Sequence, residues 1–184
     1  MKAVTLRRNL IAALWGFAEA TLFFILPDVL LTWIALDDDR LAWTACLWAL
    51  VGVLAGGSVM YGWGAYDAGT ALAVLDHVPA VSQAMSDTVG EQIRTQGIVA
   101  LFLGPISGIP YKIYAVQAGA TQQNLLVFLC VSALARLMRF MFFTGLAILV
   151  RRLASRLTLS ACRVAHIVLW TIPYGWYFWR FWGS

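Results

Sequence analysis

The stretch Leu103-Gly-Pro-Ile-Ser-Gly-Ile-Pro-Tyr-Lys112 interrupts a segment, Gly97 to Gly119, that is otherwise almost wholly apolar. Its two prolines lack a backbone donor, and its two glycines allow backbone conformations that end helices. As helices, the roughly seven residues before the break and ten after it would span about 10 and 15 Å. Each piece would cross only about half of a hydrocarbon core ~30 Å thick. We therefore expect segment 97–120 to be re-entrant, turning back inside the membrane. The residues of its break are Gly104, Pro105, Gly108 and Pro110.

Lys112 stands directly beside this break. Irregular backbone at membrane depth is tolerated where it is buried in protein or lines a wet cavity. A charged residue beside such a break is typical of a transport site. The alternative is one spanning helix kinked by proline, with the Lys112 side chain reaching an interface. The segment alone leaves both interpretations open.

The composition is typical of an integral membrane protein. The 184 residues are 61% hydrophobic and only 12% charged, and the mean hydropathy is +0.78. Nine tryptophans suit the aromatic belts at membrane interfaces. The net charge is +4, but the bases gather near the ends of the chain, which favours a role in topology over nucleic-acid binding. We expect one membrane domain, residues 1–184.

The sequence contains no recognisable catalytic or metal-binding pattern. Cys46, Cys130 and Cys162 lie far apart, without the spacing of a zinc site or a redox motif. The two histidines, His77 and His166, lack a metalloprotease context. Nucleophile-elbow, Walker A and dinucleotide-binding motifs are absent. We therefore expect no enzyme activity, no cofactor and no metal.

A second broken segment is expected at residues 9–36. This range is apolar except for Glu19 and Asp28, and Pro27 stands beside the second acid. As one helix it would be about 42 Å long, which is too long for an untilted span. A break at Pro27-Asp28 would leave pieces of about 17 and 8 residues, since proline ends a helix.

Residues 41–66 carry no charge and form the clearest transmembrane helix. Gly52 and Gly56 have the small-xxx-small spacing that lets another helix approach closely. Gly64 and neighbouring glycines extend this small-residue seam. We expect the seam to pack against another helix, within the chain or in a second copy.

The order of segments indicates an internal repeat. Re-entrant segment 9–36 and helix 41–66 are matched by re-entrant segment 97–120 and a transmembrane helix at 122–150. Such corresponding pairs are typical of an inverted-repeat transporter. The expected fold is therefore an all-α integral membrane protein. Outside the repeat lie a polar amphipathic loop, 67–96, and a last transmembrane helix, 164–182.

The distribution of bases predicts the topology. The N-terminal bases and the basic linker 151–163 favour the cytoplasmic side. The loop 67–96 has one base, Arg94, against four acids, which favours the opposite side. Two re-entrant segments place this loop outside, whereas four spans would place it inside. We therefore expect a cytoplasmic N-terminus and an extracytoplasmic C-terminus.

Five ionisable residues fall at apparent membrane depth. At about 2.5–3.5 kcal/mol each, leaving all five unpaired would cost roughly 12–17 kcal/mol. They must therefore pair or line a wet cavity. The acids lie in the first half of the chain and the bases in the second, so docking the two broken segments would bring them together. The five are Glu19, Asp28, Lys112, Arg136 and Arg139.

Two interpretations of these charges remain open. The first is a structural ion-pair cluster that fixes the two halves in register. The second is a binding site in which the three bases hold an anionic head group, since three bases against two acids leave one positive charge. Glu19 is in an apolar setting, where a carboxylate can take up a proton, so proton coupling is a further option.

Three stretches together resemble the DedA family of VTT-domain membrane proteins, and most closely its short YqaA-like branch. The resemblance covers roughly residues 10–150. The first stretch runs from Glu19 to Pro27-Asp28-Val-Leu-Leu, and the second is Gly56-Gly-Ser-Val-Met-Tyr-Gly-Trp-Gly64. The third is Ile109-Pro-Tyr-Lys-Ile-Tyr-Ala-Val-Gln-Ala-Gly119.

The resemblance implies two facing re-entrant loops in an inverted repeat, a bacterial inner-membrane location and movement of phospholipid or undecaprenyl phosphate. It also implies frequent dependence on the proton-motive force. The family's acids carry over to Glu19 and Asp28, and its base before Ala-Gly carries over to Lys112. Larger members have an earlier arginine where this chain reads Phe102-Leu-Gly-Pro105, and Arg136 or Arg139 is the candidate to replace it.

Three functions therefore compete. The first is a transporter or scramblase for a lipid with an anionic head group. The second is a proton-coupled carrier or channel for a small ion or solute, and the third is a structural membrane-assembly protein. A cavity open sideways to lipid favours the first, and a sealed cavity favours the second. The expected partners are membrane lipids and protons, without nucleic acid, and homo-oligomerisation stays open.

Overall fold

The computed structural model describes residues 2–79, 81–102, 104 and 108–181. All regular elements in these ranges are helices, so the expected all-α class is confirmed. Pro105, one residue of the expected second break, lies outside the described ranges. In chain order the elements are α1 (Lys2–Thr21), α2 (Pro27–Ala35), α3 (Asp39–Leu75), α4 (Gln83–Gln96), the 3-10 helix η1 (Gly97–Phe102), α6 (Tyr111–Ala120), α7 (Leu125–Leu153) and α8 (Leu159–Phe181).

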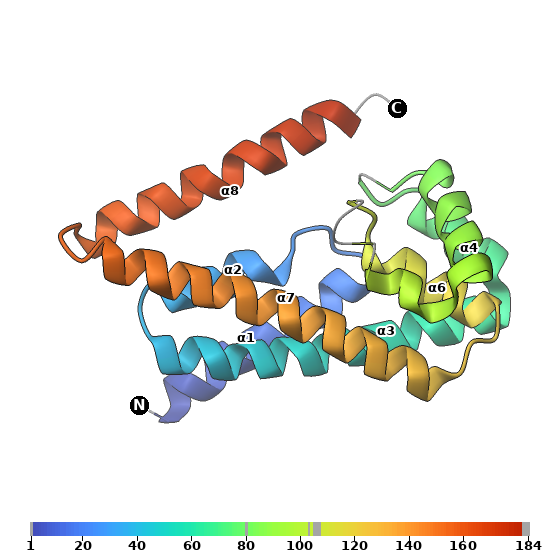
Figure 1. Ribbon diagram of the computed structural model, residues 1–184, viewed down its shortest axis with the longest axis horizontal. Helices are drawn as coiled ribbons and strands as arrows, with labels where there is room; N and C mark the ends of the chain where they lie inside the picture. Colours follow the sequence, from blue (N-terminus) through green and yellow to red (C-terminus); the bar gives the residue numbers. More distant parts are fainter. Residues whose placement is uncertain (1, 80, 103, 105–107, 182–184) are drawn as a thin grey trace.

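Two of the described helices, α3 and α7, are long and apolar enough to cross a membrane. They contact each other and run along the long axis of the molecule (Figure 1). Residues 164–181 of the expected span 164–182 lie in α8, which the same criterion of length and apolar composition does not select. Tryptophan and tyrosine, which are frequent in α8, are less apolar than the aliphatic residues of α3 and α7.

The first break lies earlier than expected. Helix α1 ends at Thr21 and α2 begins at Pro27, so the non-helical residues are 22–26 and not Pro27-Asp28. Proline is favoured in the first turn of a helix because its fixed φ suits the helix and its missing donor is not needed there. Pro27 therefore starts α2, and Asp28 lies in the first turn, where the helix dipole stabilises a carboxylate.

The second interruption separates η1 from α6. Gly97 ends α4 with φ 66°, and Gly108 adopts φ 73°, both in the left-handed region that favours glycine. Pro110 then precedes the first residue of α6, Tyr111. The apolar residues before the break form a 3-10 turn, not an α-helix.

Helix α3 is longer than the expected range 41–66. It continues to Leu75, but Asp67 has non-helical φ and ψ, which marks a kink at the end of the uncharged stretch. The Asp67 carboxylate accepts hydrogen bonds from the Thr70 amide, 3.0 Å, and the Thr70 hydroxyl, 2.6 Å. These contacts cap the last part of the helix, as an aspartate does at a helix start. The range 67–96 is thus two helical pieces, the end of α3 and α4.

Glycines bring α1 and α6 against α3. A Cβ at Gly52 would overlap the backbone of Ala13 in α1, and a Cβ at Gly64 would overlap the backbone of Val116 in α6. Gly56 also faces α1, at the carbonyl of Phe17. The approach is reciprocal, since Gly16 of α1 and Gly119 of α6 lie equally close to the α3 backbone. Helix α3 is therefore the central element on which the ends of both broken segments pack.

Candidate functional site

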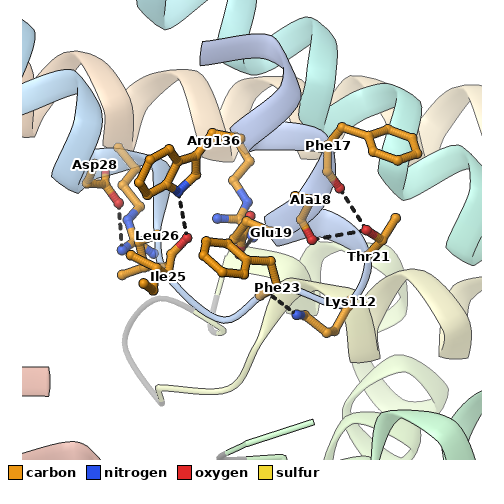
Figure 2. A network of polar contacts seen from close by, with 12 residues as sticks. Phe17, Ala18, Glu19, Thr21, Phe23, Ile25, Leu26, Asp28, Lys112 and Arg136 are labelled. Atoms are coloured by element: carbon orange, nitrogen blue, oxygen red, sulfur yellow. Dashed lines mark hydrogen bonds and ion pairs between the residues drawn. The ribbon is translucent and has the colours of Figure 1, made fainter. Parts of the chain in front are cut away.

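The two breaks meet at Lys112. Its ammonium donates a hydrogen bond to the carbonyl oxygen of Phe23, 2.6 Å away, in the loop after α1 (Figure 2). Carbonyl groups after the end of a helix lack intrahelical partners, and a cation there is favoured by the helix dipole. The Lys112 side chain is 2% exposed. Lys112 of the second broken segment therefore caps the C-terminal end of α1 in the first broken segment.

Glu19 pairs with Arg136 across the interior. Nη2 of Arg136 is 3.2 Å from Oε1 of Glu19, joining the last turn of α1 to the middle of α7 (Figure 2). Both residues are buried, at 3% and 5% exposure. A buried charge without a partner is strongly destabilising, so this ion pair accounts for how both residues are tolerated.

Asp28 pairs with Arg139. Nη2 of Arg139 is 2.9 Å from Oδ2 of Asp28, which is fully buried. Arg136 and Arg139 are three residues apart and therefore share one face of α7. Glu19 and Asp28 lie on either side of the 22–26 break, so one face of α7 contacts both ends of it. The sequence required the five charges to pair or to line a wet cavity, and in the structure each of the two acids pairs with an arginine.

The third base has no carboxylate partner. Among the described residues, no acid lies within ion-pair distance of Lys112, which bonds a neutral carbonyl instead. The cluster of Glu19, Asp28, Lys112, Arg136 and Arg139 therefore contains one positive charge more than its ion pairs use. We call these five residues the charged cluster.

Tyr111 fixes the position of Arg136. The guanidinium carbon of Arg136 is 4.5 Å from the centre of the Tyr111 ring, a cation–π contact. The ring stacks on Phe128, with centroids 6.0 Å apart and planes 11° apart. A Cβ at Gly57 would overlap the Tyr111 hydroxyl, so the small residue in α3 leaves room for the ring.

Several polar atoms of the cluster are buried without a hydrogen-bond partner in the described part of the chain. They include Oε2 of Glu19, Oδ1 of Asp28 and Nη1 of Arg136. Such groups are usually satisfied by ordered water, because burying them unpaired costs about 1–3 kcal/mol each. We therefore expect water molecules within the cluster.

A cavity of about 270 Å³ opens beside the cluster. Four of its five members line it, the exception being Asp28. The start of α6 also lines it, and a helix N-terminus attracts anions through its free amides and its dipole. Most of the remaining wall is apolar or aromatic, including Phe23 and Phe24 of the first break. We call this space the head cavity.

Helix α8 forms one side of the head cavity with Trp170, Pro173, Tyr174 and Tyr177. It runs back from the end of α7 and contacts α2 (Figure 1). The Leu26 amide donates a hydrogen bond to the Tyr174 hydroxyl, 2.8 Å. One turn before Tyr174 in α8, Trp170 Nε1 donates a hydrogen bond of 3.3 Å to the hydroxyl of Thr32. Thr32 lies one turn after Asp28 in α2. Helix α8 is therefore held to the element that carries Asp28.

Tyr174→Phe should lower the stability of the protein by weakening the attachment of residues 22–26 to α8. The Leu26 amide would lose its acceptor, which costs about 1–3 kcal/mol when the group stays unsatisfied. The measurement is the thermal unfolding midpoint of the purified protein in detergent. The matched control is Tyr66→Phe, because Tyr66 is 92% exposed. Equal midpoints for both variants would contradict the role assigned to the Tyr174 hydroxyl.

Sequence reasoning missed four residues that the structure places at the site or in the helix packing around it. Tyr111 and Tyr174 are aromatic residues in apolar surroundings, where they give no distinct signal, although each adjoins a proline or a charged residue. The Phe23 carbonyl is a backbone group, which no residue type reveals. Gly16 was missed because no other glycine stands near it in the sequence, whereas Gly52 and Gly56 have the recognisable small-xxx-small spacing.

The fold and the site together define an all-helical protein with two long apolar helices and a buried charged cluster where two interrupted segments meet. No family model, curated protein or solved structure matches the chain.

Proposed function

We propose that this protein moves lipids with an anionic head group, a phospholipid or a polyprenyl phosphate, from one membrane leaflet to the other. The observation that carries the proposal concerns Lys112, a buried base in the wall of the head cavity that has no acidic partner among the described residues. A phosphate would supply the missing negative charge. The N-terminus of α6 would add amide donors to the same group.

The size and walls of the head cavity support a head group as its occupant. About 270 Å³ is slightly below the usual range for ligand pockets, roughly 300–1,000 Å³, and is too small for a whole lipid. The wall of the cavity is mainly apolar. The cavity is also partly open, so the hydrocarbon chains of a lipid whose head group is bound there would extend outside the charged cluster. The volume also suits a small inorganic or organic anion, which keeps a small-solute carrier as the second candidate.

The proposal includes the arrangement in the membrane. The broken segments α1–α2 and η1–α6 would be re-entrant, α3 and α7 would span, and the two halves would form an inverted repeat of the DedA type. Helix α8 would be a third span. The N-terminus would then be cytoplasmic in a bacterial inner membrane, with residues 67–96 and the C-terminus outside. The close approach of α1 and α6 to opposite ends of one α3 seam supports such a repeat.

Proton coupling would act through Glu19. Its Oε2 is buried without a hydrogen-bond partner among the described residues, while Oε1 contacts Arg136. An anionic head group that draws Arg136 toward the cavity would leave this carboxylate less compensated. A phosphate monoester carries up to two negative charges, one more than the excess positive charge of the cluster, and a proton bound at Glu19 would balance the second.

Lipid movement is tested in liposomes that contain the purified protein and a tail-labelled fluorescent phosphatidylglycerol. Dithionite added outside quenches only outer-leaflet label, so quenching beyond half reports transfer. Lys112→Met should slow this transfer about tenfold or more, the factor expected for losing one charge-assisted hydrogen bond. Lys112→Arg, which keeps the charge, is the matched control and should retain more of the rate.

Three outcomes separate the candidates. Transfer by the wild type, with Lys112→Met slower than Lys112→Arg, supports lipid transport. No transfer by the wild type, with or without an imposed pH gradient and with either a phospholipid or a polyprenyl phosphate probe, overturns it. Uptake of a radiolabelled small anion by the same liposomes would then favour the second candidate.

A further inference from the structure

A second cavity lies where α1, α2 and α8 come together. It has a volume of about 300 Å³ and is lined by residues of three helices. Trp15 comes from α1, Leu30 and Trp33 from α2, and Ile167 and Trp170 from α8. The charged cluster contributes no residue to this second cavity. We call this space the apolar cavity.

The polar atoms around the apolar cavity are used inside the protein. Trp15 Nε1 donates to the carbonyl of Ile25, 3.0 Å, and Trp170 Nε1 donates to the Thr32 hydroxyl. The ring Nε2 of His166 also contacts this hydroxyl, at 2.8 Å. The wall therefore presents mainly ring and aliphatic carbon, which suits hydrocarbon and not a charged group.

The two cavities are successive along α8. The α8 residues that line the apolar cavity are His166, Ile167, Trp170 and Thr171. Those that line the head cavity are Trp170, Pro173, Tyr174 and Tyr177, so Trp170 is shared by both. With a rise of 1.5 Å per residue, their centres along the helix are about 8 Å apart. A lipid has its parts in the same order. Its charged head group is followed by its hydrocarbon chain within a distance of about one or two helical turns.

We infer that the apolar cavity binds the hydrocarbon chain of a lipid whose anionic head group occupies the head cavity. This inference rests on the proposed function and adds the position of the chain. Ile167 is 54% exposed, so the cavity is accessible from the surface of α8. The lipid would then lie along α8 beside Trp170, which lines both cavities.

Photo-crosslinking tests the position of the chain. The full-length protein is placed in phosphatidylcholine vesicles with phosphatidylglycerol that carries a diazirine in its acyl chain. Adducts should concentrate on peptides containing Leu30, Trp33 and Ile167. Labelling there should fall several-fold in Lys112→Met, since the head group no longer anchors the chain, and with a diacylglycerol probe of the same chains.

Two adjacent residues provide a functional comparison. Ile167 lines the apolar cavity, whereas Val168 does not, yet both are branched, aliphatic and about half exposed, at 54% and 51%. A tryptophan at position 167 should fill the cavity and slow phosphatidylglycerol transfer about tenfold, the factor for two methylene groups losing their burial. Val168→Trp should leave the rate unchanged.

The outcomes distinguish this inference from the proposed function. Equal adduct formation with the charged and uncharged probes, or equal rates for Ile167→Trp and Val168→Trp, overturns the chain site while transport stands. A wild type that moves no lipid, yet labels at the apolar cavity in a manner dependent on Lys112, overturns transport and keeps the binding site. Lys112-dependent labelling together with a slow Ile167→Trp supports both.

Discussion

Arg136→Ala is expected to lower the free energy of unfolding by about 3–5 kcal/mol and to stop lipid transfer. The substitution leaves the Glu19 carboxylate buried without its ion-pair partner, 3.2 Å away in the wild type. It also removes the cation that lies over the Tyr111 ring. Stability is measured by unfolding in detergent, and transfer by dithionite quenching in liposomes.

A double variant separates structure from transport. Glu19→Gln combined with Arg136→Met removes both charges of the pair, so no buried charge is left alone. Since buried ion pairs are often replaced by neutral groups at little cost, the double variant should recover most of the lost stability. It should not recover transfer. Recovery of both would make the pair purely structural and would contradict the proposal that it takes part in lipid movement.

The exposed ion pair between Arg152 and Asp39 is the control for charge removal as such. Its side chains are 71% and 39% exposed. Exposed pairs contribute about 0–1 kcal/mol, so Arg152→Ala should change stability far less than Arg136→Ala. A similar loss for both variants would mean that burial does not set the cost at Arg136.

Gly64→Ala is expected to destabilise the protein by about 1–3 kcal/mol or more, through overpacking. The added Cβ would overlap the backbone of Val116, and backbone on both sides leaves no flexible side chain to give way. Helices α3 and α6 must then separate, which displaces Tyr111 and Lys112 at the start of α6. The unfolding midpoint in detergent should therefore fall, together with the rate of lipid transfer.

Gly62→Ala is the matched control in the same helix. A Cβ at Gly62 meets nothing within 4 Å. Alanine is favoured over glycine in a helix interior by up to about 1 kcal/mol, so this variant should be as stable as the wild type or slightly more so. A loss of stability at Gly62 equal to that at Gly64 would contradict the close packing of α3 on α6.

The sequence could predict that the charges meet, but not the partner of each. The cost of five unpaired charges in an apolar environment requires pairing. The choice of Arg136 for Glu19 and Arg139 for Asp28 depends on how α7 is rotated against the 22–26 break, which no local pattern encodes. The third base differs again, because Lys112 bonds a backbone carbonyl.

The helix boundaries, too, could be predicted from the sequence only in part. Proline marked the neighbourhood of the first break, but whether it ends one helix or starts the next depends on the preceding residues, and here Pro27 starts α2. The end of the uncharged stretch at Tyr66 coincided with a kink at Asp67, not with the end of α3. The sequence therefore predicted where the backbone changes direction more accurately than it predicted where the helices end.

The pairing of acids near the N-terminus with arginines late in the chain has a consequence for biosynthesis. Glu19 and Arg136 are separated by 117 positions. At about 5–20 residues per second, translation needs roughly 6–23 s to deliver Arg136 after Glu19. During this interval a nascent chain inserted in the membrane holds two carboxylates without their partners. We expect the first half to leave the insertion machinery only after α7 has been made, so that truncated chains ending before α7 are degraded.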